Sequence, residues 1–206
     1  ELTLHLDENL DPANFNPLVS EAYLETLRAS IRAAKRLGAP IVNMHMNKGV
    51  YFTLPEGKTY LYERYRDAYL SRIDALRSLC EREVRGSMVR VAIENTDGYL
   101  DFQREAILRL LESQAFVLTW DVGHSHRAKR DDLPFLLEHA HRIAHFHIHD
   151  ANASGDHLAL GEGDVDLSER LGRARAAGAR CVIETKTVRA LESSVAWLRE
   201  RGWMDG

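Results

Sequence analysis

The sequence contains little cysteine and proline and has no long apolar run. Its 206 residues include five prolines and two cysteines, Cys80 and Cys181. Two cysteines cannot build a disulfide framework, and because both lie in apolar surroundings we expect buried, reduced thiols. The apolar runs are far shorter than the ~18–20 residues that cross a bilayer, so no transmembrane helix is predicted. No charged segment followed by an apolar one opens the chain, and we therefore predict a cytoplasmic protein.

Charge and composition exclude further classes of protein. A net charge of −4, with 28 % charged and 45 % hydrophobic residues, is ordinary for a globular chain and excludes a disordered or fibrous one. The negative charge also argues against a protein whose whole surface binds nucleic acid, although it is compatible with a local basic cleft. Histidine, in contrast, is abundant: there are ten, against six phenylalanines. Most of them adjoin short apolar runs, where a purely structural protein has little use for them.

Short apolar segments alternate with amphipathic stretches along the chain. The predicted strands are residues 2–7, 40–47, 89–95, 116–123, 143–150 and 181–186. The predicted helices cover about residues 20–37, 60–85, 100–113, 132–141, 167–177 and 190–201. Repeating strand–helix units without hairpin signals predict a parallel sheet, because parallel strands need crossover connections. No linker rich in Pro, Gly or Ser divides the chain, so we expect one domain over residues 1–206.

The number of strand–helix units bears on the fold class. A complete (β/α) barrel of eight units typically needs ~250 residues, whereas this chain has six units in 206 residues. The first predicted strand also begins almost at residue 1. We therefore expect an α/β protein with a (β/α) TIM-type barrel that lacks about two N-terminal βα units, rather than an open six-stranded sheet.

Polar side chains gather near the C-terminal end of each predicted strand. Alternate residues of a strand share a face, and in four strands an acidic or imidazole side chain lies opposite a continuous apolar face. These four residues are Glu94, Asp121, His147 and Glu184. Functional groups of parallel α/β sheets gather at the carboxyl ends of the strands, so the four are expected to converge if the sheet curls.

A cation is needed if these side chains meet. Carboxylates buried face to face are costly as anions unless a positive charge compensates them. Three carboxylates with one imidazole suit a divalent ion such as Mn²⁺, Mg²⁺, Co²⁺ or Zn²⁺. Four further histidines are candidates for holding more ions or binding substrate oxygens: His5, His45, His124 and His157.

Five segments together resemble the xylose-isomerase-like TIM-barrel superfamily. They are IENT at 93–96, WDVGH at 120–124, HFHIHD at 145–150, DHLALGEGDVD at 156–166 and VIET at 182–185. Each segment is a weak signal alone, but their order and spacing are specific to the superfamily, although not to one activity. The superfamily includes sugar and sugar-phosphate isomerases and epimerases, as well as the endonuclease IV group of DNA-repair enzymes. The resemblance extends from His5 to Glu184.

The resemblance implies roles for the candidate residues. It implies that Glu94, Asp121, His147 and Glu184 form a central metal site. In the isomerase and epimerase branch, the two glutamates also exchange a proton, and His124 contacts the substrate.

In the endonuclease branch, His5 and His45 join Glu94 around an additional zinc, while His124 and His157 help to hold another. That last zinc also takes an aspartate at the position where this chain has Gly155. The ketose 3-epimerases carry a glutamate and an arginine in the neighbourhoods where this chain has Leu100 and Ala153. Neither branch is therefore matched completely.

We predict a divalent-metal-dependent isomerase or epimerase that acts on a sugar or sugar phosphate. Glu94 and Glu184 are the expected acid/base pair, working through a metal-stabilised enediolate, and the four further histidines are expected to bind substrate. The expected partner is a small molecule rather than nucleic acid or a membrane, with a homo-oligomer as a possible assembly. Two alternatives stay open: an endonuclease IV-like zinc phosphodiesterase acting on abasic DNA, or a metal-binding barrel remnant without catalysis.

Overall fold

The computed structural model describes residues 2–128 and 132–204, which form two compact units. The first unit contains the chain up to residue 94 and residues 100–117. The second contains residues 95–99 and the chain from residue 118 onward. None of the helices in the described part of the chain is long and apolar enough to cross a membrane.

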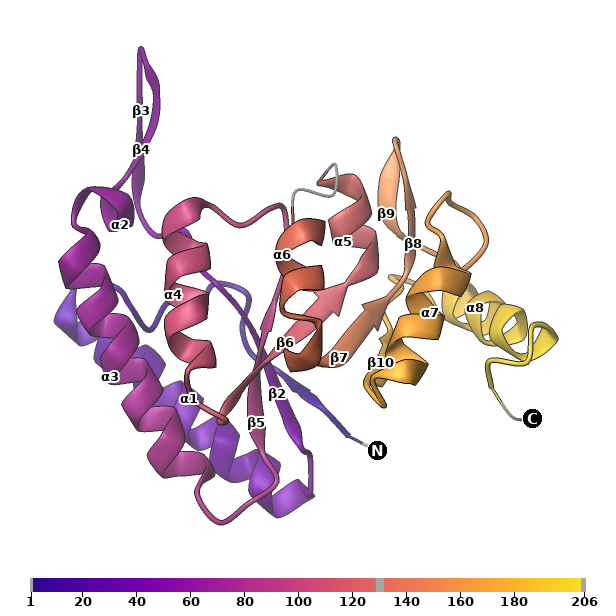
Figure 1. Ribbon diagram of the computed structural model, residues 1–206, viewed down its shortest axis with the longest axis horizontal. Coiled ribbons are helices and arrows are strands. Elements are labelled where there is room, and N and C mark those ends of the chain that lie inside the picture. The colour runs from indigo at the N-terminus through magenta and orange to yellow at the C-terminus, as the bar shows by residue number, and fades with distance from the viewer. Residues whose placement is uncertain (1, 129–131, 205–206) are drawn as a thin grey trace. The chain divides into compact units, whose positions relative to one another are not determined.

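Three parallel strands form the sheet of the first unit. They are β1 (Leu4–His5), β2 (Ile41–His45) and β5 (Arg90–Glu94) (Figure 1). β2 pairs with both of the others, and the register places His5 opposite Asn43 and His45 opposite Glu94. The polar ends of three predicted strands therefore lie side by side at one edge of this sheet.

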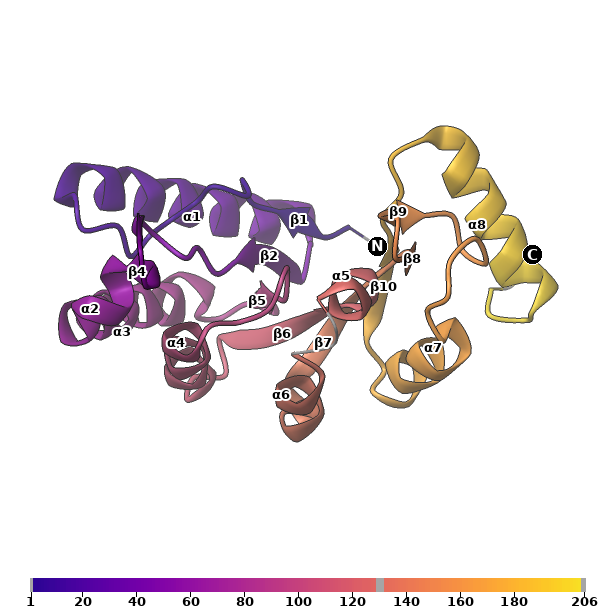
Figure 2. The ribbon, with the colours of Figure 1, turned by 90° about the horizontal axis from the view of Figure 1, so that it is seen from above.

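Helices pack around these strands. They are α1 (Pro17–Leu37), α2 (Leu61–Arg64), α3 (Arg66–Val84) and α4 (Asp101–Leu111). The side chain of Asn16 accepts the Leu18 N–H at the start of α1, and Gly38, with φ of 68°, ends it in the left-handed conformation that glycine tolerates. α1 contacts β2 and lies beside β1 and β2 in Figure 2. The helix predicted over residues 60–85 is interrupted at Tyr65, which separates α2 from α3.

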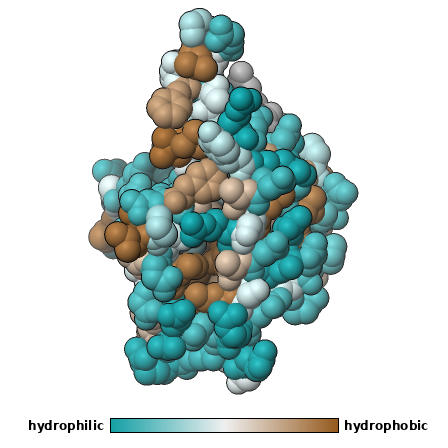
Figure 3. Space-filling model, turned by 90° about the vertical axis from the view of Figure 1, so that its left-hand side faces the viewer, coloured by the Kyte–Doolittle hydropathy of each residue, from teal (hydrophilic) through white to brown (hydrophobic). Residues whose placement is uncertain are grey.

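A hairpin that the sequence did not predict extends from the first unit. Strands β3 (Tyr51–Leu54) and β4 (Gly57–Tyr60) pair antiparallel (Figure 1). All four residues of β3 are exposed, and the apolar side chains of the projecting hairpin are visible as brown atoms in Figure 3. The expectation of no hairpins is therefore wrong. A strand this short, with neither face buried, leaves no alternation of apolar and polar residues to detect.

Three parallel strands also form the sheet of the second unit. They are β6 (Phe116–Asp121), which begins in the first unit, β7 (Ile143–Ile148) and β10 (Arg180–Ile183). The register places both Asp121 and Val182 opposite His147. A second unpredicted hairpin, formed by β8 (Asp150–Asn152) and β9 (Gly155–Leu158), follows β7.

The helices of the second unit follow the predicted order with one addition. They are α5 (Val122–Arg127), α6 (Leu133–Glu138), α7 (Leu167–Ala176) and α8 (Val188–Glu200), with a 3-10 turn at Ala140–Arg142. α5, which was not predicted, begins directly after β6, and its N-cap is Asp121. Cys80 is buried as expected, but Cys181 is exposed. The expectation for Cys181 is therefore wrong, because β10 pairs with β7 alone and its residues are only half-buried or exposed.

Candidate metal centre

The second unit gathers three possible metal ligands at the ends of its parallel strands. Asp121 is the last residue of β6, His147 lies near the end of β7, and Glu184 directly follows β10. His147 Nδ1 lies 2.9 Å from Glu184 Oε2 and 3.9 Å from Asp121 Oδ2. One ligand atom from each of the three lies within 4.8 Å of the others. The parallel register brings about this closeness, because it sets β6 and β10 on either side of His147.

The chemistry of this group suits a divalent cation. Asp121 is 0 % exposed and His147 is 3 % exposed. A buried carboxylate beside a second carboxylate is unfavourable unless a positive charge compensates both. Carboxylate oxygen and imidazole nitrogen are ligands of Zn²⁺, Mn²⁺ and related ions. The donor set therefore fits a metal ion.

Asp121 is fixed through both its backbone and its side chain. Its N–H donates to Asn95 Oδ1 at 2.9 Å, and Asn95 Nδ2 donates to the Asp121 carbonyl oxygen at 3.0 Å. Its Oδ1 accepts the backbone N–H of His124 at 2.7 Å, which caps α5. Asn95 was not among the predicted site residues, because its role depends on hydrogen bonds that the pattern of the sequence does not show.

His149, which was not among the predicted site residues either, contacts the other side of Asp121. The ring is 0 % exposed, and its Nε2 lies 2.9 Å from Asp121 Oδ1 and 3.1 Å from Oδ2. The backbone N–H of His157 donates to His149 Nδ1 at 2.8 Å. Burial opposes charging of this imidazole, but the hydrogen bond and negative charge of Asp121 outweigh burial and raise the pKa of His149 above its ordinary value.

Two predicted substrate-binding residues lie against His149. The rings of His149 and His157 stack with centroids 4.2 Å apart, and the ring of His124 lies edge-on to both with centroids 5.2 Å away. One ring nitrogen from each of the three lies within 4.8 Å of the others. The structure therefore brings His124 and His157 together beside Asp121.

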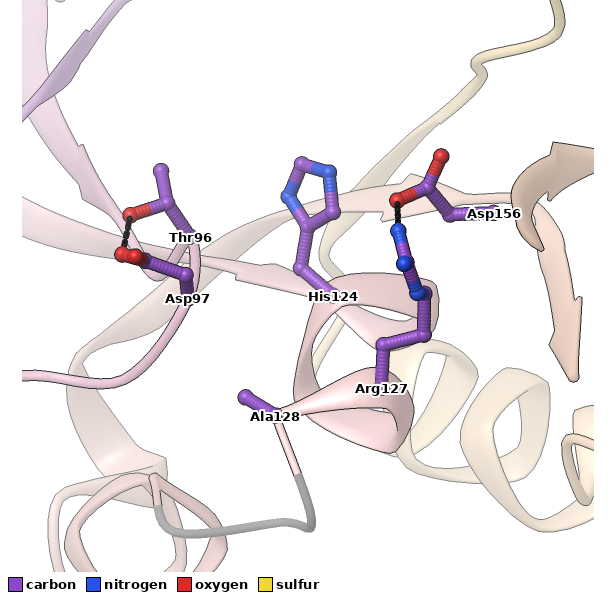
Figure 4. A pocket seen from close by; sticks show the side chains of 6 residues that line it. All are labelled: Thr96, Asp97, His124, Arg127, Ala128 and Asp156. Carbon is purple, nitrogen blue, oxygen red and sulfur yellow. Dashed lines mark hydrogen bonds and ion pairs between the residues drawn. The ribbon is translucent and has the colours of Figure 1, made fainter. Parts of the chain in front are cut away.

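A cavity of about 360 Å³ opens next to these histidines. It is lined by Thr96, Asp97, His124, Arg127, Ala128 and Asp156 (Figure 4). His124 and Arg127 both rise from α5, and Arg127 donates to Asp156. Partial burial disfavours the charged form of Asp156, but its bond to Arg127 and the nearby positive charges lower the pKa of this carboxyl below its ordinary value. The cavity therefore presents hydroxyl, carboxylate, imidazole and guanidinium groups to a polar ligand.

The first unit holds a group of polar side chains around Glu94. This carboxylate is 1 % exposed, and its Oε2 accepts a hydrogen bond from Asn43 Nδ2. The Nε2 atoms of His5 and His45 lie 3.2 Å and 3.3 Å from the same oxygen. His5 Nδ1 also lies 2.6 Å from the carbonyl oxygen of Leu6, to which it donates. In a neutral His5 ring, Nε2 therefore carries a lone pair that faces a carboxylate oxygen. Two acceptor atoms that face each other repel, and a cation bound between them would remove this repulsion.

Within each unit, the predicted site residues form a group. The group of the first unit comprises His5, His45 and Glu94. The group of the second unit comprises Asp121, His124, His147, His157 and Glu184. The polar residues that hold these groups in place and that were not predicted are Asn43, Asn95 and His149.

Comparison with known proteins identifies relatives for nearly the whole chain. The model of the xylose isomerase-like TIM-barrel family matches residues 1–201. An uncharacterized protein of Methanocaldococcus jannaschii is 26 % identical over 173 residues, which cover 81 % of this chain. The chain spans only 62 % of the length of that relative.

Solved structures give the same result. A D-tagatose 3-epimerase-like protein superposes with a TM-score of 0.73 at 25 % identity, covering 97 % of this chain and 76 % of the other. The TTHB071 protein of Thermus thermophilus, whose crystals were soaked with ZnCl₂, superposes with a TM-score of 0.70 at 25 % identity, covering 100 % and 80 %. The predicted TIM-type (β/α) fold is therefore confirmed, and the chain belongs to the xylose isomerase-like TIM-barrel family.

Proposed function

We propose that this protein is a divalent-metal-dependent isomerase or epimerase acting on a sugar or sugar phosphate. The observation that carries the proposal is the group Asp121, His147 and Glu184, whose ligand atoms lie within 4.8 Å of one another. Family membership and the 25 % identity to a D-tagatose 3-epimerase-like protein support the reaction class. Glu94, the last residue of β5, is the proposed fourth ligand, as the strand-end pattern of the sequence predicts.

The residues of the site divide into ligands and acid/base groups. The bound ion supplies positive charge beside the carbonyl and hydroxyl oxygens of an open-chain sugar. Glu184, the least buried of the group, removes the proton from the carbon next to the carbonyl, leaving its electron pair on the substrate. Glu94 returns a proton to the neighbouring carbon in an isomerase, or to the opposite face of the same carbon in an epimerase. Asp121 and His147 hold the ion.

Substrate binding is assigned to histidines and to the cavity beside them. His124 lines the cavity and His157 stacks against its neighbour, so both present ring atoms toward a ligand there. His5 and His45 are proposed to bind substrate oxygens beside Glu94.

Solvent deuterium exchange tests the reaction. The metal-loaded protein is incubated with a panel of ketoses and ketose phosphates in D₂O, and incorporation next to the carbonyl is measured by mass spectrometry. Glu184→Gln and Glu94→Gln are expected to lower the exchange rate by about 10²–10⁴-fold. Glu162→Gln, which changes an exposed glutamate of the loop after β9, is the control and is expected to exchange normally. Absence of exchange with every sugar contradicts the proposal.

One observation favours a second candidate function. The approach of His5 and His45 to a single oxygen of Glu94 provides an imidazole and carboxylate donor set within the first unit. A zinc phosphodiesterase related to endonuclease IV uses more than one ion, and such a group would hold the additional one. Metal analysis decides: one ion per chain supports the isomerase, whereas two or three ions with nicking of an abasic-site duplex support the phosphodiesterase.

Location and assembly stay predictions from the sequence. The expected cytoplasmic location and homo-oligomer are tested by fractionation of cells and by light scattering of the purified protein. A small molecule is the proposed partner, because the substrate class follows from the reaction.

A further inference from the structure

His149 is a buried polar residue that the proposed reaction does not use. It lies just beyond the end of β7, is 0 % exposed and stacks on His157. Both ring nitrogens have partners: Nε2 faces Asp121, and Nδ1 accepts the His157 backbone N–H at 2.8 Å. The Asp150 carbonyl oxygen also lies near Nδ1, but at a longer distance of 3.2 Å. Because a backbone N–H can only donate, a neutral His149 ring carries its proton on Nε2 and donates it to Asp121.

His149 contacts both oxygens of the Asp121 carboxylate, since its Nε2 also lies 3.1 Å from Oδ2. Oδ1 lies 2.7 Å from the His124 N–H and 2.9 Å from His149 Nε2. Oδ2 lies 3.4 Å from His124 Nδ1 and 3.9 Å from His147 Nδ1. The His124 N–H and the His149 ring together fix the rotation of the carboxylate, in which Oδ2 also faces His147.

The backbone near Asp121 leaves room for this ring. Gly123 follows Asp121 by two residues, and a Cβ on Gly123 would lie 2.0 Å from Cε1 of His149. Any side chain at this position would displace the ring from Asp121.

A metal ion held by His124, His149 and His157 is the competing interpretation, since their ring nitrogens lie within 4.8 Å of one another. The hydrogen bonds of His149 oppose it. A metal ligand needs an unprotonated nitrogen with a free lone pair, but Nδ1 already accepts the His157 N–H and Nε2 points at a carboxylate. Metal binding at His149 would therefore break a hydrogen bond inside the unit.

We propose that His149 is a positioning residue, which orients Asp121 for metal binding and links it to the backbone of β9. The proposal depends on the proposed function in one respect, namely that Asp121 binds the metal. Residues that only orient a ligand typically change metal affinity by about 10–100-fold when they are lost. His149 also connects Asp121 to the hairpin that carries His157.

Zn²⁺ titration against a chromophoric chelator tests the role of Nε2. His149→Leu removes both hydrogen bonds of the ring. In His149→Gln, the side-chain amide nitrogen occupies the position of the imidazole Nε2 and still donates a hydrogen bond to Asp121. We expect His149→Leu to bind Zn²⁺ about 10–100-fold more weakly than the wild type, and His149→Gln to recover most of that loss. Phe116→Leu, which removes a fully buried ring at the start of β6, controls for the loss of a buried ring and is expected to retain the affinity.

The outcomes separate the proposal from its alternatives. Equal affinities of His149→Leu and the wild type contradict it, as does a His149→Gln affinity as low as that of His149→Leu. A second Zn²⁺ ion that is lost in His149→Leu shows that His149 is a ligand. If the wild type binds no divalent ion, the proposed function fails. In that case ¹⁵N NMR of the metal-free protein still tests the role of His149. A neutral ring with its proton on Nε2 supports the hydrogen bond to Asp121, whereas a neutral ring with its proton on Nδ1 contradicts it.

Discussion

Each unit carries a buried carboxylate at the end of a parallel strand, and the surroundings of the two differ. Glu94 in the first unit has Asn43, His5 and His45 around a single oxygen, Oε2. In the second unit, the backbone N–H of His124 donates to Oδ1 of Asp121, and the buried ring of His149 lies against both oxygens, of which Oδ2 also faces the imidazole of His147. One carboxylate is thus surrounded by side chains from neighbouring strands, whereas the other is oriented by a helix N-terminus and a buried ring.

The difference indicates distinct tasks. Backbone hydrogen bonds from a helix N-terminus and a strand end do not rearrange during a reaction, so Asp121 is suited to holding an ion in one geometry. The partners of Glu94 are side chains, and two of them are imidazoles that can also contact a substrate. Glu94 is therefore better suited to exchange a proton with a substrate.

The largest expected effect is the loss of the ligand in the second unit. Asp121→Asn keeps the size of the side chain but removes the negative charge, and we expect Zn²⁺ affinity to fall by more than about 100-fold. Asn43→Ala, which removes only a partner of Glu94, is expected to cost about 10-fold. Zn²⁺ titration of both variants measures the contrast. Equal losses would show that the two carboxylates do not differ in the way described.

Gly123→Ala is expected to have the next largest effect. The new Cβ would lie 2.0 Å from the His149 ring, and overpacking of this kind costs about 1–3 kcal/mol of unfolding free energy. The displaced ring should also weaken Zn²⁺ binding by about 10-fold. Urea denaturation and metal titration measure the two effects.

Gly172→Ala is the matched control for that change. A Cβ at Gly172, which lies within α7, meets nothing within 4 Å. Alanine there is expected to raise the unfolding free energy by about 0.5–1 kcal/mol, because it reduces the freedom of the unfolded chain. A destabilisation of the same size at both positions would rule out the clash with His149 as the cause.

A second buried carboxylate in the first unit gives a pH-dependent effect. Burial of Asp11 raises its pKa above the ordinary value, despite hydrogen bonds from Tyr62 and Asn14. A raised carboxyl pKa stabilises the fold below the pKa of the unfolded chain, and this stabilisation is lost as pH rises through the folded pKa. Asp11→Asn stays neutral, so its unfolding free energy relative to the wild type should rise between about pH 3.5, below the ordinary pKa of the carboxyl, and about pH 7.5. Urea titrations at the two pH values measure the gain, and a constant difference contradicts the assignment.

The smallest expected effect concerns the histidines of the first unit. If His5 and His45 bind substrate, then His5→Ala and His45→Ala should leave one Zn²⁺ per chain. The two substitutions should each lower the affinity for Zn²⁺ by less than about 10-fold, which is the smallest loss typical of removing a residue that orients a metal ligand. Metal analysis after dialysis checks the count. Loss of a second ion in either variant supports the phosphodiesterase instead.

The order of strands and the position of polar side chains followed from the sequence alone. Polar side chains recur at every second position near the ends of β2 and β6, and the last residues of β2, β5 and β6 are His45, Glu94 and Asp121. Since parallel strands share a carboxyl edge, neighbouring strand ends had to meet within each sheet.

What the sequence did not reveal depends on hydrogen bonds rather than on periodicity. α5 escaped detection because it begins without a loop after β6 and has only six residues. His149 lies beyond the last residue of β7, where the two-residue alternation of the strand no longer determines direction. The roles of Asn95 and His149 follow only from their bonds to Asp121.

Anomalous diffraction from Zn²⁺-loaded crystals, recorded on both sides of the zinc absorption edge, tests the central claim most directly. The account predicts one strong anomalous peak per chain, with Glu94, Asp121, His147 and Glu184 each placing an oxygen or nitrogen about 2.1 Å from it. A crystal without a peak at these residues, or with its peak bound by His5 and His45 but not by Asp121, would contradict the account.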